Sequence, residues 1–305
     1  MKGASVPMPA KPQIWTQIGE QSGLAVPVQK NGLVDPSQLL LKAWKRSGLV
    51  TASGREGIKF LCRFLRLKAD DDVAIFSTRS NQFVSSHVTC SIFDYARPSK
   101  VFSDRTKLLY VIHLFGEPHE KLDEVYELAR KKKLPVIEDC AHTMYEGEHS
   151  HRIGERADFV LFSLPKAFAL PVGGILLGDF GHQRASMGGM ENYLGNLAHE
   201  LQNVTAYLMR RQAIFRKFSD AIKSCGWKPL FEPADKIWPY AFPFEVDDEE
   251  MILKKIKRAL PHVEVCPWNK RGVLSLPVHQ ALTDDEVDEI IEALRNVGSE
   301  AVYGK

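Results

Sequence analysis

An amphipathic helix between two apolar strands is the feature that most constrains the fold of this chain. Residues Leu108–Ile112 form an apolar run, Leu122, Val125 and Leu128 follow at helical spacing, and Leu134–Asp139 begins as a second apolar run. Acidic residues come early in the helix and three lysines come at its end, which matches the helix dipole and reads as a solvated helix end rather than a nucleic-acid patch. The pattern predicts a βαβ unit within an α/β fold.

Composition excludes several classes of protein. The chain has 305 residues and a mass of 34.4 kDa, with 44% hydrophobic and 26% charged residues, which indicates about two globular domains rather than disorder. Its 40 basic and 38 acidic residues give a net charge of +2, so we expect no nucleic acid and no membrane as a partner.

The start of the chain and the cysteines predict a cytoplasmic protein. Residues 1–19 contain polar and proline residues where a secretion signal would need an apolar segment. The five cysteines are odd in number, widely spaced and without a Cys-x-x-Cys pair, which favours reduced thiols packed in the core. We therefore expect neither disulfides nor a metal site.

The most apolar stretch, residues 159–180, places a lysine in apolar surroundings. Lys166, two prolines and the pair Gly173-Gly174 interrupt it, which excludes a membrane helix. It reads instead as a buried strand over 158–163, a turn that contains Lys166, and a second strand over 175–177.

The rest of the chain suggests three regions. Residues 1–48, irregular and rich in proline, are expected to form an N-terminal arm over the surface or against a partner subunit. Residues 49–205 are expected to form a large α/β domain, and residues 206–305 a connecting helix and a small C-terminal α+β domain. Within these regions we expect a long helical stretch over 191–223, strands over 241–246, 263–266 and 273–276, a helix over 248–260, and a last helix opened by a capping box over 283–286.

Three chemical features follow predicted strands of the larger region. Ser53 and Gly54 lie at a helix N-terminus, Asp139 ends one strand, and Ser163 with Lys166 follows another. The carboxyl ends of strands in an open α/β sheet converge on one crevice. Amides and hydroxyls for a phosphate, a carboxylate for a pyridinium nitrogen and an amine for an aldehyde are the groups that pyridoxal 5′-phosphate (PLP) requires.

Four motifs then point to a known family. They are Leu109-Tyr-Val-Ile-His-Leu-Phe-Gly116, Leu134-Pro-Val-Ile-Glu-Asp-Cys-Ala-His142, Phe162-Ser-Leu-Pro-Lys166 with Gly173-Gly174, and Leu274-Ser-Leu-Pro277 before Leu282-Thr-Asp-Asp-Glu-Val287. In order and spacing the chain resembles the DegT/DnrJ/EryC1/StrS family of PLP-dependent sugar aminotransferases, from about Thr51 to Val297, as a shortened and divergent member.

The resemblance implies both a fold and a reaction. The fold is that of the fold type I PLP-dependent transferases, similar to aspartate aminotransferase, with a large mixed-sheet α/β domain and a small C-terminal α+β domain. The expected form is a homodimer with active sites at the interface. The reaction is transfer of an amino group, from glutamate or glutamine, to a keto sugar that is usually linked to a nucleotide, in amino-sugar, polysaccharide or natural-product biosynthesis.

Two catalytic residues carry over from the family. Lys166 matches the Schiff-base lysine, and burial there would favour the neutral amine that this role needs. Asp139 matches the carboxylate that keeps a proton on the pyridine nitrogen. Glu138, its neighbour on the strand, is expected to point the other way.

The cofactor-binding residues carry over with more departures. Gly54 and Ser53 match the phosphate turn, where Arg55 replaces the usual threonine and points either to the phosphate or to solvent. Ser163 matches the serine that reaches the same phosphate. His142 matches the residue beside the ring hydroxyl, with a hydrogen-bonded core histidine as the alternative. Phe83 reads either as the aromatic residue that stacks on the cofactor ring or as a core phenylalanine.

Other departures leave alternative functions open. The chain is shorter than the family norm between Phe93 and Lys107, Leu-Pro-Val-Gly-Gly at 170–174 replaces an acidic glycine-rich segment, and residues 192–196 match the partner-subunit Asn-x-Arg motif only loosely. A noncatalytic relative kept for binding or assembly is one alternative. A sugar dehydratase is another, although related dehydratases have histidine at the position of Lys166.

Overall fold

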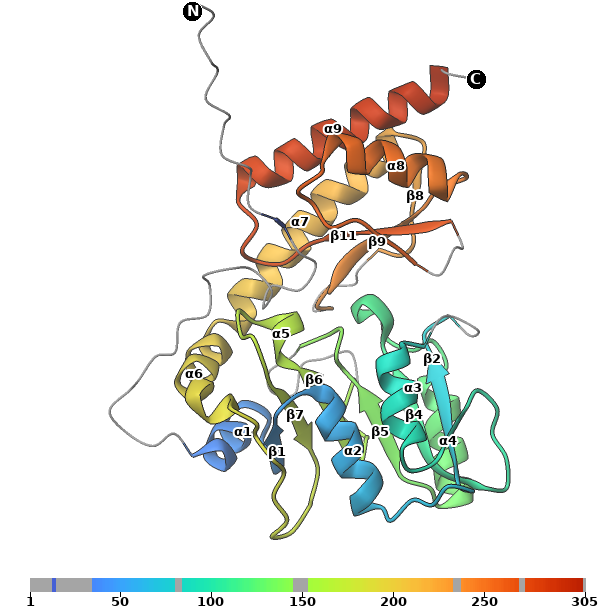
Figure 1. The fold of residues 1–305 in the computed structure, drawn as a ribbon, viewed down its shortest axis with the longest axis vertical. Coiled ribbons are helices and arrows are strands. Elements are labelled where there is room, and N and C mark those ends of the chain that lie inside the picture. The colour runs from blue at the N-terminus through green and yellow to red at the C-terminus, as the bar shows by residue number, and fades with distance from the viewer. Residues whose placement is uncertain are drawn as a thin grey trace, which may run out of the picture.

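The computed structural model describes residues 13–14, 35–79, 84–144, 153–232, 237–268 and 272–303. The chain forms one seven-stranded and one four-stranded sheet. Figure 1 shows these sheets in a larger and a smaller part of the molecule. The long helix α7 (Val204–Ser224) rises from the larger part into the smaller one.

The larger sheet is mixed, with strand order β1-β7-β6-β5-β4-β2-β3. Neighbouring strands from β3 to β6 are parallel, and β7 is antiparallel to both β6 and β1. Strand β1 therefore runs in the same direction as β6. The strands are β1 (Gly48–Thr51), β2 (Asp72–Ser77), β3 (Arg97–Ser99), β4 (Thr106–Ile112), β5 (Val136–Asp139), β6 (Phe159–Ser163) and β7 (Gly174–Leu177).

The βαβ unit expected from the sequence is confirmed. Helix α4 (Leu122–Lys132) joins β4 to β5, which pair in parallel. Leu122 and Val125 of α4 pack against Leu109, Val111 and the other side chains on that face of the sheet. The helix has acidic residues in its first turn and basic residues in its last.

Helices cover both faces of the larger sheet. Helices α2 (Gly54–Phe64) and α3 (Ser86–Phe93) pack on one face, which includes Leu161. Helices α1 (Pro36–Trp44), α4 and α6 (Leu194–Gln202) lie on the other face, where Val160 and Phe162 point. This alternation along β6 is what buries the strand on both sides.

The expectation of an irregular segment from the start of the chain to residue 48 is wrong for its last part. Residues Pro36–Trp44 form α1, which Asp35 caps by accepting a hydrogen bond from the Ser37 amide. Trp44 stacks on Phe162 at a ring distance of 5.2 Å. The proline at the first helical position is compatible with a helix, so proline content alone did not exclude one.

The smaller part contains an antiparallel sheet with strand order β10-β11-β9-β8, and α7 and two further helices pack against it. Its remaining elements are β8 (Lys228–Pro229), β9 (Ala241–Glu245), α8 (Glu249–Ala259), β10 (Cys266–Pro267), β11 (Val273–Pro277) and α9 (Asp284–Tyr303). The capping box is confirmed, because Thr283 and Glu286 exchange hydrogen bonds between side chain and backbone.

Two sequence expectations in this half of the chain are corrected. The expected strand over 263–266 pairs with β11 only from Cys266, and Val263 instead forms an isolated bridge with Ile14. The long helical stretch divides at Asn203 into α6 and α7, after a short 3₁₀ turn η3 (Met190–Tyr193). Among the described residues, no helix is both long enough and apolar enough to span a membrane.

Candidate active site

The residues singled out by the sequence lie at one edge of the larger sheet. Strands β1, β5 and β6 run in the same direction, so their carboxyl ends meet at this edge. Ser53 follows β1, Asp139 ends β5, and Ser163 ends β6 just before the four-residue helix α5 (Leu164–Ala167). Parallel strand direction is therefore what gathers them.

Asp139 is buried and held by two hydrogen bonds. The Tyr110 hydroxyl donates to Oδ2 at 2.7 Å, and the Ala141 amide donates to Oδ1 at 2.9 Å. Tyr110 is fully buried on β4, and burial, with the nearby charge of Asp139, raises its pKa well above the ordinary value. Tyr110 therefore stays protonated, and its hydroxyl holds the Asp139 carboxylate in place by donating a hydrogen bond to it.

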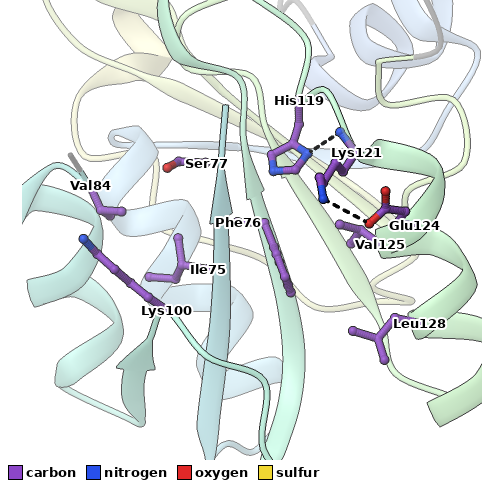
Figure 2. A pocket seen from close by; sticks show the side chains of 10 residues that line it. All are labelled: Ile75, Phe76, Ser77, Val84, Lys100, His119, Lys121, Glu124, Val125 and Leu128. Atoms are coloured by element: carbon purple, nitrogen blue, oxygen red, sulfur yellow. Dashed lines mark hydrogen bonds and ion pairs between the residues drawn. The ribbon is translucent and has the colours of Figure 1, made fainter. Parts of the chain in front are cut away.

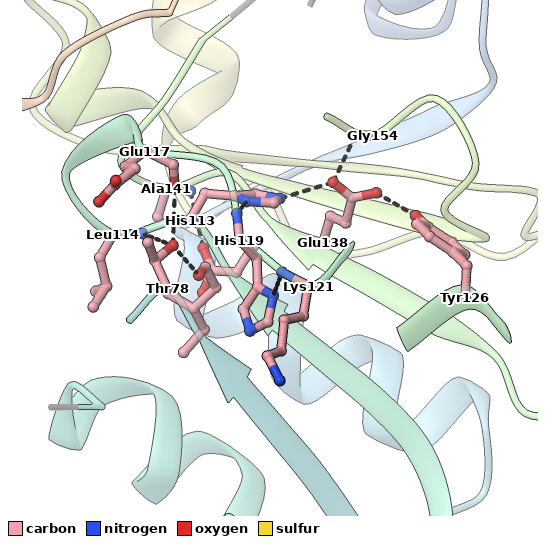
Figure 3. A network of polar contacts seen from close by, with 12 residues as sticks. Thr78, His113, Leu114, Glu117, His119, Lys121, Tyr126, Glu138, Ala141 and Gly154 are labelled. Carbon is pink, nitrogen blue, oxygen red and sulfur yellow. Dashed lines mark hydrogen bonds and ion pairs between the residues drawn. The ribbon is translucent and has the colours of Figure 1, made fainter. Parts of the chain in front are cut away.

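Glu138 points to the opposite face, as the sequence predicted, and forms its own buried network (Figure 3). It contacts His113 Nε2 at 2.7 Å, the Gly154 amide at 2.8 Å and the Tyr126 hydroxyl. His113 Nδ1 accepts from the His119 amide at 3.1 Å, so the proton on His113 lies at Nε2 and is donated to Glu138. Burial raises the pKa of Glu138, but these donors outweigh it and hold the pKa below its ordinary value.

Lys166 lies in α5, in the half-buried turn that the sequence predicted. Its ammonium nitrogen Nζ lies 5.4 Å from the centre of the Tyr240 ring. Burial lowers the pKa of Lys166, and the negative charge of Asp139 acts in the opposite direction. The balance makes the neutral amine more accessible than in an ordinary lysine, and it places Lys166 within electrostatic range of Asp139.

His142 joins this group through Tyr240. Its ring stacks on the Tyr240 ring at 4.2 Å with an interplanar angle of 14°. The Phe115 amide donates to Nδ1 at 3.1 Å, which leaves the proton of the neutral ring on Nε2. Burial, and then the charge of Lys166, lowers the pKa of His142 well below its ordinary value, so the ring is neutral at pH 7.

Ser53, Gly54 and Ser163 form a cradle around the N-terminus of α2. The Ser53 hydroxyl caps the helix by accepting from the Glu56 amide at 3.3 Å. A Cβ added to Gly54 would lie 3.7 Å from Ser163 Cβ and 4.0 Å from its hydroxyl oxygen, so the two residues are neighbours. The first amides of a helix have no acceptor within the helix, and an anion can satisfy them.

Gly174 permits this cradle to form. A Cβ on Gly174 would lie 2.6 Å from the Gly54 amide nitrogen and 2.8 Å from Thr51 Oγ1. These are backbone and core atoms that cannot move aside, so a side chain is excluded at this position. The glycine pair that interrupts the apolar stretch and belongs to one of the family motifs therefore also has a packing role.

Arg55 is exposed and lines a cavity of about 390 Å³ with Ser53, Lys59 and His87. Burial, followed by the charges of Arg55 and Lys166, lowers the pKa of His87, which places this ring within range of both cations. Sequence reasoning missed His87. Phe83, the expected stacking residue, lies outside the described residues.

A second cavity, of about 380 Å³, lies beside β2 and α4 (Figure 2). Phe76, His119, Lys121 and Glu124 are among its lining residues, and Lys121 pairs with Glu124 at 3.6 Å. None of Ser53, Gly54, Asp139, His142, Ser163 and Lys166 lines it. In the part of the chain that the structure describes, no group of three or more His, Cys, Asp or Glu side chains could hold a metal ion.

Comparison with known proteins finds a match to a family model over the central part of the chain. Residues 71–193, which contain Asp139, His142, Ser163 and Lys166, match the model of the DegT/DnrJ/EryC1/StrS aminotransferase family. The resemblance read from the sequence motifs is therefore confirmed.

Solved structures share the fold of most of the chain. The aminotransferase TlmJ from Streptoalloteichus hindustanus is 19% identical, with a TM-score of 0.65 over 84% of this chain and 86% of its own. Spr1654 from Streptococcus pneumoniae, assigned as a sugar aminotransferase and solved in its PMP form, is 16% identical, with a TM-score of 0.70 over 88% and 92%. An aminotransferase from Psychrobacter cryohalolentis is 17% identical, with a TM-score of 0.66 over 86% and 90%. These likenesses confirm the expected fold class.

Proposed function

We propose that this chain, whose central residues 71–193 match an aminotransferase family, is a PLP-dependent aminotransferase that acts on a keto sugar. One observation carries the proposal. An amine with a lowered pKa, a buried carboxylate and a helix N-terminus flanked by serine hydroxyls lie at the same sheet edge. Spr1654, a protein of the same fold, has been solved in PLP and PMP forms.

The donor set at this edge fits the chemistry of PLP. The N-terminal amides of α2, with Ser53 and Ser163, offer hydrogen-bond donors to a phosphate. Each oxygen of Asp139 already accepts one bond and has a further lone pair for a pyridinium nitrogen. His142 offers Nε2–H to an oxygen on the ring, and Lys166 offers its amine to the aldehyde.

The residues then divide the work of amino transfer. When bound, PLP supplies a carbonyl that takes up the amino group and a ring that withdraws electrons. Burial lowers the pKa of Lys166, so its amine would be available as a nucleophile, and Nζ would be the base that accepts the proton from the α-carbon of the amino donor. Asp139, fixed by Tyr110 and Ala141, holds the proton on the ring nitrogen.

The finer parts of the proposal rest on the family resemblance of the sequence. They are glutamate or glutamine as amino donor, a nucleotide-linked keto sugar as acceptor in a biosynthetic pathway, and a homodimer with its active sites at the interface. A cytoplasmic location belongs to the proposal as well. It is supported by the sequence, in which five widely spaced cysteines without a Cys-x-x-Cys pair favour reduced thiols.

Half-reaction spectroscopy tests the proposal. The protein is incubated with PLP, and the unbound PLP is removed. L-Glutamate or L-glutamine is then added while the absorbance of the cofactor is followed. We expect conversion to the amine form of the cofactor, and return of the original spectrum on adding a keto-sugar nucleotide. Lys166→Ala is the control and should not convert. A wild-type protein that retains no PLP would contradict the proposal and favour a noncatalytic relative.

A further inference from the structure

A buried arginine on the helix that connects the two parts of the molecule holds the backbone of the Lys166 turn. Arg211 lies on α7 with none of its surface exposed. Its guanidinium donates to the carbonyl oxygens of Lys166 at 3.3 Å, Ala167 at 3.2 Å and Pro239 at 3.1 Å, and to Oε1 of Gln280 at 2.7 Å. One side chain therefore joins the turn to two segments of the smaller part.

All four of these acceptors are neutral oxygens. Burying a charged guanidinium costs free energy, and a hydrogen-bonded carboxylate normally offsets this cost. Around Arg211 the hydrogen-bond acceptors are instead backbone carbonyls and a side-chain amide. The Trp238 ring lies 4.6 Å from the guanidinium carbon and gives a cation–π contact. The five donors of a planar guanidinium can serve several carbonyls in fixed directions, which a lysine cannot do. The arrangement is suited to holding backbone in place.

A second side chain holds the same turn. Gln280 donates from Nε2 to the Ala167 carbonyl at 2.9 Å, so that carbonyl has two donors. The segment Lys166–Ala167 is thus anchored both from α7 and from the smaller part.

The turn needs such anchors because it cannot fix itself. Helix α5 has four residues, about one turn, and the Phe168 amide that ends it donates to the Leu164 carbonyl. Lys166 extends from it on a flexible four-carbon stem. The position of the Lys166 backbone therefore decides whether Nζ lies over Tyr240 and within range of Asp139, His142 and His87.

We infer that Arg211, assisted by Gln280, is a positioning residue for the catalytic amine of Lys166. By fixing the carbonyls of Lys166 and Ala167, it keeps Nζ in its buried position and couples that position to the smaller part. The inference rests on the proposed function, because the position of Nζ matters to catalysis only if Lys166 is the reacting amine.

The test compares three variants, with the titration done on the PLP-free protein and the trapping after PLP is added. Arg211→Lys keeps the positive charge but loses the several directed hydrogen bonds. Gln280 is half-buried, and Gln280→Ala removes the second donor to the Ala167 carbonyl. Arg210→Lys is the matched control, because Arg210 is the next residue on α7 but binds Asp284 and the Leu282 carbonyl near the surface. Lys166 is titrated by competitive labelling with acetic anhydride over a pH series, with mass spectrometry of its peptide as the readout.

We expect the Arg211 and Gln280 variants to raise the apparent pKa of Lys166 toward 10.5, the ordinary value of lysine, because a loosened turn lets water reach Nζ. The rate at which borohydride traps PLP on Lys166 should fall about 10- to 100-fold, as for a misplacement of about 1 Å. The Arg210 variant should match the wild type in both measurements.

Folded Arg211→Lys and Gln280→Ala proteins whose Lys166 titrates as in the wild type would overturn the inference, and so would an equal change in Arg210→Lys. If Arg211→Lys does not fold, Gln280→Ala decides alone. If the wild type captures no PLP, the proposed function fails, while the titration of Lys166 still reports whether Arg211 and Gln280 hold its turn.

Discussion

Asp139 and Lys166 lie within electrostatic range of each other, and neighbouring groups act on both. Tyr110 and the Ala141 amide hold the carboxylate, and burial favours the neutral form of the amine. The two residues are thus suited to serve the two ends of a conjugated cofactor.

Replacing Asp139 tests its part directly. Asp139→Asn keeps the shape of the side chain but removes the charge that holds a proton on the ring nitrogen. We expect kcat to fall about 10²- to 10³-fold, the size of effect seen when one electrostatic stabiliser is removed. Steady-state kinetics with saturating PLP measure this. A variant with wild-type kcat would show that the carboxylate is not the partner of the ring.

Lys166 should lower the stability of the protein at neutral pH. Its folded-state pKa lies below its unfolded value of 10.5, so between the two pKa values the unfolded chain binds more protons and stability rises with pH. Below the folded-state pKa, both states are protonated and the full cost of the buried ammonium is present. Lys166→Met should therefore be more stable than the wild type at pH 7, with a difference that shrinks toward pH 10.5. Urea unfolding of the PLP-free proteins measures this, and a less stable variant at pH 7 would contradict it.

At the scale of elements, the site depends on how closely the ends of β1, β6 and β7 approach the N-terminus of α2. Thr51 and Ser163 both pair with Gly174, which brings the serine cradle together. The absence of a side chain at Gly174 is therefore a structural requirement of the proposed phosphate site.

Gly54 of the cradle and Gly174 beside it should respond differently to replacement by alanine. In Gly174→Ala, the new Cβ would lie 2.6 Å from backbone atoms, and we expect a loss of about 1–3 kcal/mol in the free energy of unfolding together with weaker PLP binding. In Gly54→Ala, the nearest atoms lie at 3.7 Å, an ordinary contact, and stability should change little. Chemical denaturation of both variants gives the comparison. Equal destabilisation of the two variants would contradict the explanation that only a Cβ at Gly174 meets backbone atoms too closely.

Sequence patterns located the residues at the carboxyl edge of the larger sheet. They did not locate the residues that reach the site from α7 and from the smaller part. Asp139 could be placed because it ends an apolar strand within a βαβ unit, and Lys166 because it interrupts an apolar stretch. Tyr110 was within reach, since it lies in the neighbouring strand on the same face as Asp139. Tyr240 carried no local signal, because it comes from the distant smaller part, and Arg211 looked like one more basic residue on a long helix.

At the scale of the whole molecule, the two parts meet where the site lies. The smaller part contributes Tyr240 and Gln280, and α7 contributes Arg211. Each of these reaches Lys166, its turn or His142. The proposed chemistry therefore depends on the packing of both parts rather than on the larger sheet alone.

The proposed homodimer has a direct test in solution. Sedimentation equilibrium of the purified protein should give a mass twice the 34.4 kDa of one chain, because the family places its active sites at a subunit interface. The control is Asp139→Asn, which changes a buried group and should sediment as the wild type does. A monomer at the concentrations used for activity would contradict this part of the proposal.

The most direct test of the central claim asks where PLP attaches. The wild-type protein is incubated with PLP, reduced with borohydride, digested and analysed by mass spectrometry, with Lys166→Ala treated in parallel. We predict a reduced PLP adduct on the peptide that contains Lys166, and no adduct at that site in the variant. An unmodified Lys166 peptide in the wild type, or an adduct on another lysine alone, would contradict the account.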